Sequence, residues 1–198
     1  MIRSGCRTRH SRVGVDAPAK PDPERALTTS RLVLEPLLPA HAQVLFPHLH
    51  DDRLYRYHTG RPVSVSQLEE RFQKWVARRS PDGSQTWLNY AVRRADGAYV
   101  GWVQATIAEN VATIGYDIFP TYWRQGFAKE ACRELIRTLF IERKVKRIDA
   151  VVDDENVASI GLLETLGFAR VWTGPSEDMP GRKDRRYELS NQRFIEKP

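Results

Sequence analysis

The chain is organised around the stretch from Ala112 to Ala131, ATIGYDIFPTYWRQGFAKEA. In its first half, Ile114, Tyr116 and Ile118 alternate with the residues of a second face, which is the period-2 pattern of a strand. Pro120 ends this pattern, because proline has no amide with which to continue a ladder of hydrogen bonds. The stretch therefore begins as a β-strand that stops at a short loop.

A helix is predicted after this loop, with charged residues opposite an apolar stripe. The stripe consists of Ala128, Ala131, Cys132, Leu135, Ile136, Leu139 and Phe140. The loop from Trp123 to Ala128 has a single glycine, Gly126, which permits close backbone approach where the helix starts. Free amides and the positive end of the helix dipole make such a loop suited to a pyrophosphate, and Arg124 and Lys129 would add charge. A plain β-turn-α connection has the same local pattern.

Length and composition indicate one domain with a substantial core, since the 198 residues are 41% hydrophobic and 28% charged. No apolar run approaches about 18 residues, and Met1 to Asp16 lack the apolar centre of a secretory signal, so we expect a cytoplasmic protein without a membrane span. Cys6 and Cys132 make no disulfide framework, and no histidines have H-x-x-x-H spacing, so no metal is expected. The glycine motifs of dinucleotide and nucleoside-triphosphate sites are absent.

The N-terminal segment is basic and rich in proline. From Met1 to Arg25, six Lys and Arg residues and three acidic residues give +3, half of the formal net charge of +6. With so few apolar residues, residues 1–27 are predicted to be a disordered tail. Such an arm could contact RNA or another polyanion, but it lacks interleaved aromatic residues, so a solvated leader is favoured and no nucleic-acid partner is expected. The folded domain is placed at 28–192, with a C-terminal tail at 193–198.

Hydrophobic periodicity predicts alternating strands and helices along the domain. Strands are expected at 31–37, 87–93, 98–108, 112–119, 147–152, 168–172 and 186–189, and helices at 39–50, 64–80, 128–140 and 156–166. This order indicates a mixed α/β sheet. The long loop from Asp51 to Pro62 carries Tyr55 and Tyr57, which either line a substrate site or pack within the loop.

Two separate segments resemble motifs of one family. Residues 118–131, IFPTYWRQGFAKEA, resemble the acetyl-CoA motif of the GNAT superfamily of N-acetyltransferases, and residues 156–168 resemble its next strand-helix motif. Residues 29–34, TSRLVL, are similar to the opening strand of the branch that acetylates the N-termini of ribosomal proteins. The resemblance covers residues 28–190. It implies a mixed, mostly antiparallel sheet of six to seven strands, splayed between its fourth and fifth strands, with about four helices on its faces.

The resemblance also implies a site for acetyl-CoA. The pantetheine arm would fill the splay like an extra strand, bonded by the backbone of Ile118 and Phe119 and by Asn156. The pyrophosphate would lie at the helix N-terminus, where backbone amides suit a delocalised dianion. The residues assigned to it are Arg124, Gln125, Gly126, Phe127, Ala128 and Lys129.

The chain departs from the family pattern at two positions. Trp123 replaces the Gln or Arg that usually opens the loop, so a side-chain contact with phosphate is lost there while backbone binding survives. Leu163 replaces the usual catalytic tyrosine and has no proton to donate. In the branch resembled here, a serine at the position of Ser159 is thought to protonate the leaving thiolate, so Ser159 is assigned that role, with a helix-surface serine as the alternative.

The reaction also needs a base, because only a neutral amine attacks the thioester and forms the tetrahedral oxyanion. Asp117 and Glu109 lie on or beside the central strand. Either could act through a water molecule, or both could be plain solvated residues. Tyr116 either faces the substrate cleft or packs in the core.

The sequence thus predicts an acetyl-CoA-dependent N-acetyltransferase, a monomer or a homodimer. Its acceptor is a protein N-terminus or a small amine such as an amino acid, polyamine or aminoglycoside. The long loop holds Asp51 and Asp52 beside Arg53, Arg56 and Arg61, which favours a neutral or acidic acceptor, or a peptide. The alternative from another class is a non-catalytic protein that keeps the fold and binds a partner.

Overall fold

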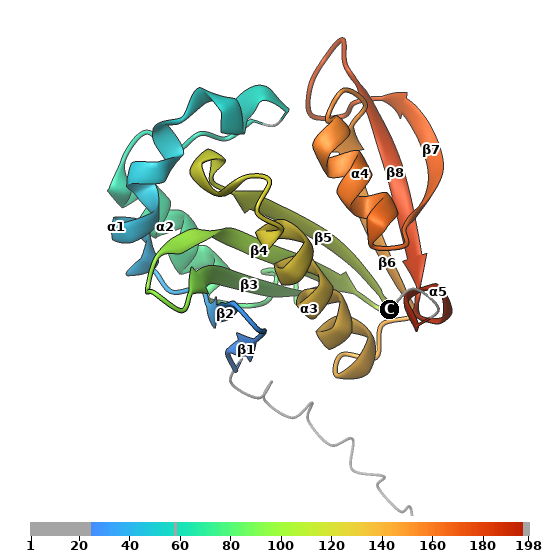
Figure 1. Ribbon diagram of the computed structural model, residues 1–198, viewed down its shortest axis with the longest axis horizontal. Coiled ribbons are helices and arrows are strands. Elements are labelled where there is room, and N and C mark those ends of the chain that lie inside the picture. The colour runs from blue at the N-terminus through green and yellow to red at the C-terminus, as the bar shows by residue number, and fades with distance from the viewer. Residues whose placement is uncertain (1–24, 58, 196–198) are drawn as a thin grey trace, which may run out of the picture.

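The computed structural model describes residues 25–57 and 59–195, and in this part of the chain one eight-stranded sheet has the order β1-β2-β3-β4-β5-β6-β8-β7 (Figure 1). The strands are β1 (Leu27–Thr28), β2 (Leu32–Pro36), β3 (Gln85–Arg94), β4 (Tyr99–Ala108), β5 (Val111–Ile118), β6 (Arg147–Asp153), β7 (Ala169–Pro175) and β8 (Lys183–Ser190). The α-helices are α1 (His41–Leu45), α2 (Val65–Trp75), α3 (Phe127–Ile141), α4 (Val157–Thr165) and α5 (Asn191–Ile195). Short 3-10 helices are η1 (Phe46–His50), η2 (Asp52–Arg56) and η3 (Pro120–Tyr122).

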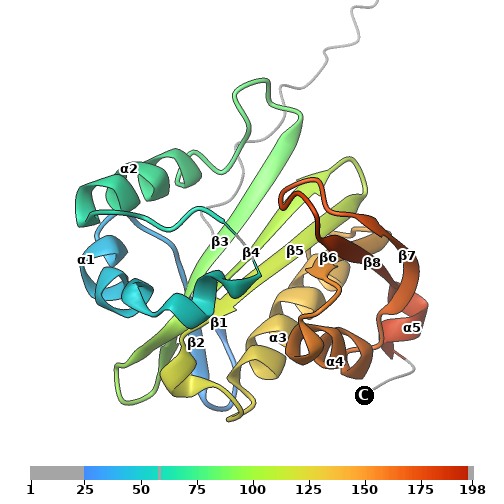
Figure 2. The ribbon, with the colours of Figure 1, turned by 90° about the horizontal axis from the view of Figure 1, so that it is seen from above.

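Helices cover both faces of the sheet (Figures 1 and 2). On one face, α1 and α2 bury Leu45, Leu68 and Phe72 against the sheet. On the other face, α3 packs on β2, β4 and β5, and α4 packs on β6. A sheet apolar on both faces needs a helical layer on each side, because both faces must be removed from water.

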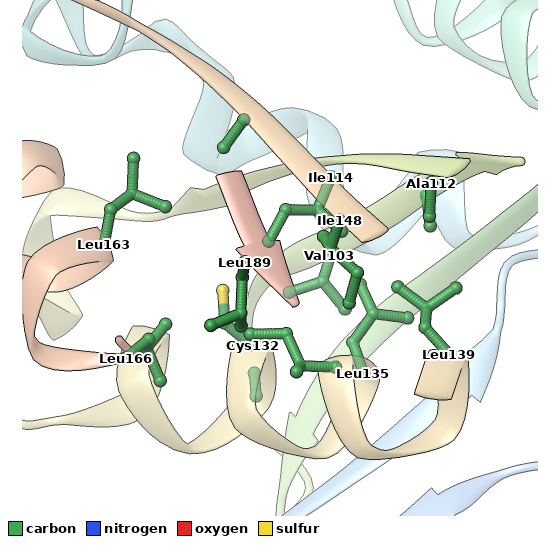
Figure 3. Close-up of a cluster of buried hydrophobic side chains, with 14 of the residues drawn as sticks. Val103, Ala112, Ile114, Cys132, Leu135, Leu139, Ile148, Leu163, Leu166 and Leu189 are labelled. Carbon is green, nitrogen blue, oxygen red and sulfur yellow. The ribbon is translucent and has the colours of Figure 1, made fainter. Parts of the chain in front are cut away.

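The core under α3 follows the helical stripe of the sequence. Figure 3 shows Cys132, Leu135 and Leu139 on α3 facing Val103 and Ile114 of the sheet. Leu135 and Leu139 are fully buried, as is the neighbouring Ile136. Each such side chain contributes about 1.5–3 kcal/mol when it leaves water. This packing fixes α3, and therefore the loop before it, against the sheet.

The sheet splays between β5 and β6, as predicted for its fourth and fifth long strands. These two strands pair in parallel only from Val111 with Arg147 to Thr113 with Asp149. Beyond that point β5 remains paired with β4 only, and β6 remains paired with β8 only. The strands consequently diverge toward their C-terminal ends, which form the open end of the splay (Figure 1).

Several elements differ from the prediction, among them the first helix, β8 and β1. The helix expected at 39–50 is α1 followed by the 3-10 helix η1, because Pro47 lacks the amide that an α-helix requires there. β8 begins at Lys183 instead of 186, since its first residues pair with β6 and β7. β1 adds an eighth strand of two residues to the seven expected.

The described chain extends beyond the predicted domain limits at both ends. The predicted tail at 1–27 lies outside the described residues except for its last three, of which Leu27 is buried and paired with Leu34. At the other end, Phe194 of α5 packs on Phe140 with ring centroids 5.7 Å apart. The last three residues lie outside the described part. In the part that the structure describes, no helix is both long and apolar enough to cross a membrane.

Candidate active site

The glycine loop, Trp123 to Gly126, leads into α3 with two residues in the left-handed region. Arg124 has a φ of 61°, and Gly126 has a φ of 81° and a ψ of 0°. Gly126 is the N-cap of α3 and provides no side-chain hydrogen bond. Among the described residues, no hydrogen bond uses the backbone amides of 124–129. Free donors in this arrangement at a helix start bind phosphate.

The side chains of the glycine loop have contacts of their own. Trp123 donates its indole N–H to the carbonyl of Ile118 at 2.5 Å, which ties the loop to the end of β5. Gln125 donates from Nε2 to the carbonyl of Thr121 at 3.1 Å. Trp123 therefore holds the loop against the end of β5, at the position where the resembled family usually has a side chain that contacts phosphate.

Arg31, just before β2, also lies against the glycine loop. Its Nη1 donates to the carbonyl of Gln125 at 3.0 Å, and its Nε donates to Glu130 at 2.6 Å. The guanidinium lies 4.7 Å from the centroid of the Phe127 ring. Sequence reasoning missed this residue, because 94 positions separate Arg31 from Gln125. The only available signal was its place in the segment 29–34 that resembles the family's opening strand.

The backbone of β5 faces the splay at alternate residues. Phe119 donates its amide to Val100 of β4 at 2.9 Å, and its carbonyl accepts from the amide of Tyr122. Both backbone groups of Phe119 thus have partners within the chain, and its predicted contact with pantetheine would need the second lone pair of its carbonyl. Backbone groups of neighbouring residues in a strand point to opposite sides. The amides of Ile118 and Tyr116 therefore point toward the splay.

The start of α4 brings Asn156 and Ser159 to the splay. Asn156 caps α4, since its Oδ1 accepts from the amide of Ser159 at 3.1 Å. The hydroxyl of Tyr116 is buried, and no partner in the described chain meets the geometry of a hydrogen bond with it. Burial raises the pKa of Tyr116 strongly, and the Ser159 hydroxyl is near enough to offset part of that rise. The structure therefore brings Tyr116 and Ser159 together, while Leu163 is buried in the core.

Asp117 lies on the opposite face of β5 from Tyr116, because side chains alternate along a strand. Burial raises the pKa of Tyr55, and the negative charge of Asp117 raises it further while Arg61 lowers it. Asp117 and the loop from Asp51 to Pro62 are consequently neighbours. Glu109 lies in the turn before β5, whose first residue, Val111, is roughly 20 Å from Asp117 at 3.3 Å per residue. The structure does not bring Glu109 to the other candidate residues.

The aromatic residues of the long loop make packing contacts. The hydroxyl of Tyr55 donates to the carbonyl of Leu49 at 3.1 Å, and the Arg61 guanidinium lies 4.6 Å from its ring centroid. Tyr57 lies between two guanidinium groups, those of Arg56 at 5.2 Å and Arg182 at 5.5 Å. Both tyrosines therefore help to build the wall of the splay's open end.

Arg182 joins this wall to the other half of the sheet. It comes from the loop between β7 and β8, and it forms a two-nitrogen ion pair with Asp153 at 2.5 and 2.8 Å. Only 2% of the Asp153 side chain is exposed. The Arg182 guanidinium holds the pKa of this carboxyl below its ordinary value. Because Arg182 also faces the Tyr57 ring, this arginine contacts both sides of the open end.

Two ion pairs form within the long loop. Asp51 forms an ion pair with Arg53 at 2.6 Å, and Asp52 forms one with Arg61 at 2.6 Å. These pairs neutralise two of the three arginines on which the preference for a neutral or acidic acceptor was based. Ion pairing leaves the net charge of the loop unchanged, but it directs two of the positive charges to carboxylates of the loop itself.

The fold and the site together define a class of enzyme. The sheet is splayed, and free amides lie at the start of a helix beside it. A hydroxyl and a carboxylate lie on the two sides of one strand. This arrangement suits acyl transfer from a long phosphorylated thioester such as acetyl-CoA. Among the described residues, no three His, Cys, Asp or Glu side chains gather as metal ligands. The arrangement is that of an acetyl-CoA-dependent acyltransferase.

Comparison with known proteins identifies the family. Residues 31–169 match the family described as the acetyltransferase (GNAT) domain. The uncharacterized N-acetyltransferase p20 of Bacillus licheniformis is 31% identical over 147 residues, which cover 73% of this chain and 82% of that protein. The chain therefore belongs to the GNAT family of acetyl-CoA-dependent N-acetyltransferases.

Solved structures show the same fold at lower sequence identity. The ribosomal-protein-S5-alanine acetyltransferase from Vibrio fischeri has a TM-score of 0.74 at 15% identity, covering 86% of this chain and 99% of that one. Mycobacterium smegmatis RimJ, in complex with CoA-disulfide, has a TM-score of 0.71 at 19% identity, covering 81% and 82%. Acetyltransferases of ribosomal proteins are thus among the structural neighbours of this chain.

Proposed function

We propose that this enzyme transfers the acetyl group of acetyl-CoA to a primary amine, and that the acceptor is a protein N-terminal α-amine. The observation that carries acetyl transfer is the splay, which has the glycine loop at its open end, Asp117 on one face of β5, and Ser159 beside Tyr116 on the other. The choice of acceptor is supported by the ribosomal-protein acetyltransferase among the structural neighbours. Acetyl-CoA supplies an activated acyl group as a thioester. A small-molecule amine is the second candidate acceptor.

Acetyl-CoA binding is assigned to the glycine loop, the first turn of α3 and the edge of β5. Amides of residues 124–129 receive the pyrophosphate, and Arg124 and Lys129 are exposed beside it. The amides of Ile118 and Tyr116 face the pantetheine arm, as does Asn156. The Oδ1 of Asn156 is used by the α4 cap, so its contact with the arm would come from Nδ2.

Asp117 is the proposed base. It is the carboxylate on β5 that neighbours Tyr55 of the loop wall, where an acceptor entering from the open end would arrive. Acting directly or through one water molecule, it would take a proton from the ammonium group so that the neutral amine can attack. Glu109 is excluded from this role by its distance.

Ser159 is the proposed proton donor to the leaving sulfur. Its amide is held by Asn156, which fixes the first turn of α4 from which the Ser159 side chain projects. The raised pKa of Tyr116 keeps that phenol protonated, so it can donate a hydrogen bond toward Ser159 as the serine gives up its proton. The missing tyrosine at Leu163 would then be replaced by this pair.

The experiment combines acetyl-CoA binding with turnover. Isothermal titration should detect acetyl-CoA binding by the wild-type protein and none by Gly126→Glu, whose carboxylate would occupy the anion site. Ser159→Ala should bind acetyl-CoA normally but lose about 10²-fold or more in kcat. Normal turnover in Ser159→Ala would reject the assigned proton donor.

Acceptors are then compared by release of CoA thiol. N-terminal peptides of ribosomal proteins and a panel of amino acids, polyamines and aminoglycosides are tested at equal concentration. A kcat/KM for peptides at least tenfold above that for every small amine is expected. The opposite ranking would replace the protein N-terminus by a small molecule as acceptor.

A further inference from the structure

Arg31 places a fixed guanidinium at the mouth of the glycine loop. Its backbone amide donates to Oε1 of Glu130 at 2.9 Å, and its Nε donates to Oε2 of the same carboxylate at 2.6 Å. Its Nη1 donates to the carbonyl of Gln125 at 3.0 Å. The Phe127 ring supports the flat face of the guanidinium at 4.7 Å. Three side-chain contacts and one backbone hydrogen bond thus hold Arg31, whose side chain is still 49% exposed.

The third nitrogen of this guanidinium points toward Gly126. A Cβ built on Gly126 would lie 3.3 Å from Nη2 of Arg31. Nη2 has no hydrogen-bond partner within the described residues. A charged donor therefore lies beside the backbone amides that are assigned to the pyrophosphate.

The negative charge of Glu130 explains why an arginine is needed beside the glycine loop. It lies in the first turn of α3, where its charge would repel a phosphate bound to the same turn. Burial raises the pKa of Glu130, but hydrogen bonds from Thr29 and Arg31 lower it more, so the carboxylate stays ionised. The hydroxyls of Thr29 and Ser30 also donate to Oε1, at 2.5 and 3.2 Å. The carboxylate is thereby turned toward β2 and neutralised by Arg31.

We propose that Arg31 is a phosphate-binding residue of the acetyl-CoA site. Its Nε and Nη1 hold Glu130 and the glycine loop in place, and its Nη2 binds the pyrophosphate. The inference rests on the acetyl-CoA site proposed above. The planar fork of arginine can make these contacts at once, whereas a lysine ammonium has a single nitrogen and cannot.

The test compares two acetyl donors that differ in their phosphates. Arg31→Gln should raise the Kd for acetyl-CoA by about ten- to a hundredfold, the range for a lost hydrogen bond to a charged group. The kcat/KM for S-acetylpantetheine, which has no pyrophosphate, should change by less than about twofold, since the lost charge-assisted contact is absent from that donor. Arg31→Lys should recover less than half of the lost binding free energy, because lysine lacks the fork.

Arg147→Gln is the matched control. Arg147 is 45% exposed and pairs through two nitrogens with Asp149, at 2.7 and 2.9 Å, and at a longer distance of 3.6 Å with Glu188. It lies at the closed end of the splay, so the control removes an equally exposed arginine and the same net charge. Its Kd for acetyl-CoA should stay within about twofold of the wild-type value, because at about 10 Å or more from the ligand its charge is screened by salt.

The outcomes separate this inference from the proposed function. An unchanged Kd for acetyl-CoA in Arg31→Gln overturns the inference, and so does an equal loss with S-acetylpantetheine, which would mean that Arg31 only supports the fold. A wild-type protein that binds no acetyl-CoA would instead overturn the proposed site itself. If Arg31→Gln does not fold, two other measurements decide: the Arg31→Lys variant, and the wild-type protein at increasing salt. The proposal requires that the lysine substitution and added salt each weaken the binding of acetyl-CoA more than they weaken the use of S-acetylpantetheine.

Discussion

Gly101 of β4 offers a sharp test of how the strands beside the site are packed. It pairs with Ile118, and its φ of 150° lies outside the range that side chains usually adopt. A Cβ built there would be 1.9 Å from the carbonyl oxygen of Asp117. Since such contacts do not fall below about 3 Å, Gly101→Ala must move β4 or β5 by about 1 Å.

The expected cost follows from these two conflicts. Backbone strain contributes about 1–3 kcal/mol and overpacking about as much again, so Gly101→Ala should lose about 2–5 kcal/mol of unfolding free energy. For a domain of this size, that lowers Tm by roughly 5–15 °C. Because Asp117 moves with its carbonyl, kcat/KM should also fall by about 10²-fold at temperatures where the variant is folded.

Gly161→Ala is the matched control for thermal unfolding followed by circular dichroism. Gly161 lies in α4, and nothing is within 4 Å of a Cβ built there. Its substitution should raise stability by about 0.5–1 kcal/mol, because glycine is a poor helix former. The reasoning would be refuted if Gly101→Ala melted within 1 °C of the wild type, or if both variants changed Tm in the same direction by similar amounts.

Three further predictions concern buried groups. Arg182→Ala should lower the free energy of unfolding, measured with urea, by about 2–4 kcal/mol, because Asp153 is left buried without its partner. The control Arg186→Ala removes an exposed ion pair and should lower it by less than about 1 kcal/mol. Equal losses in the two variants would contradict this prediction. The wild-type advantage over Arg182→Ala should be full above the unfolded pKa of Asp153, about 4, and should shrink as pH falls through the lower folded pKa, so an advantage that does not shrink on acidification would argue against the pair. In a Cys6→Ser background, Cys132 should not react with a thiol reagent at pH 8 until the protein unfolds, because burial raises its pKa to about 12; rapid labelling of the native protein would show that α3 opens.

Local patterns in the sequence predicted most of the elements that carry the site. The strand ending at Pro120, Gly126 before a helix, and Asn156 as a cap are each set by a few neighbouring residues, so periodicity and capping rules were sufficient. The break of the predicted helix 39–50 was missed, although Pro47 was visible. Apolar spacing alone does not distinguish an α-helix from an α-helix that continues as a 3-10 turn.

Contacts between distant segments could not be predicted in this way. The hydrogen bond from the Phe119 amide to the Val100 carbonyl depends on the register of β4 against β5, which pairs Gly101 with Ile118. The pairing of Arg182 with Asp153 depends on how the β7–β8 hairpin folds back on β6. The residues near each contact determine neither the strand register nor the position of the hairpin.

The sequence by itself determined the class of fold, the family and the position of the acetyl-CoA motif, because these depend on short-range periodicity and on motifs of adjacent residues. Only the tertiary structure decided which side chains meet at the splay. It separated Glu109 from Asp117, brought Tyr116 to Ser159, and set Arg31 beside Gly126. Such neighbours are selected by the packing of helices on a twisted sheet, which joins residues about a hundred positions apart that no local pattern connects.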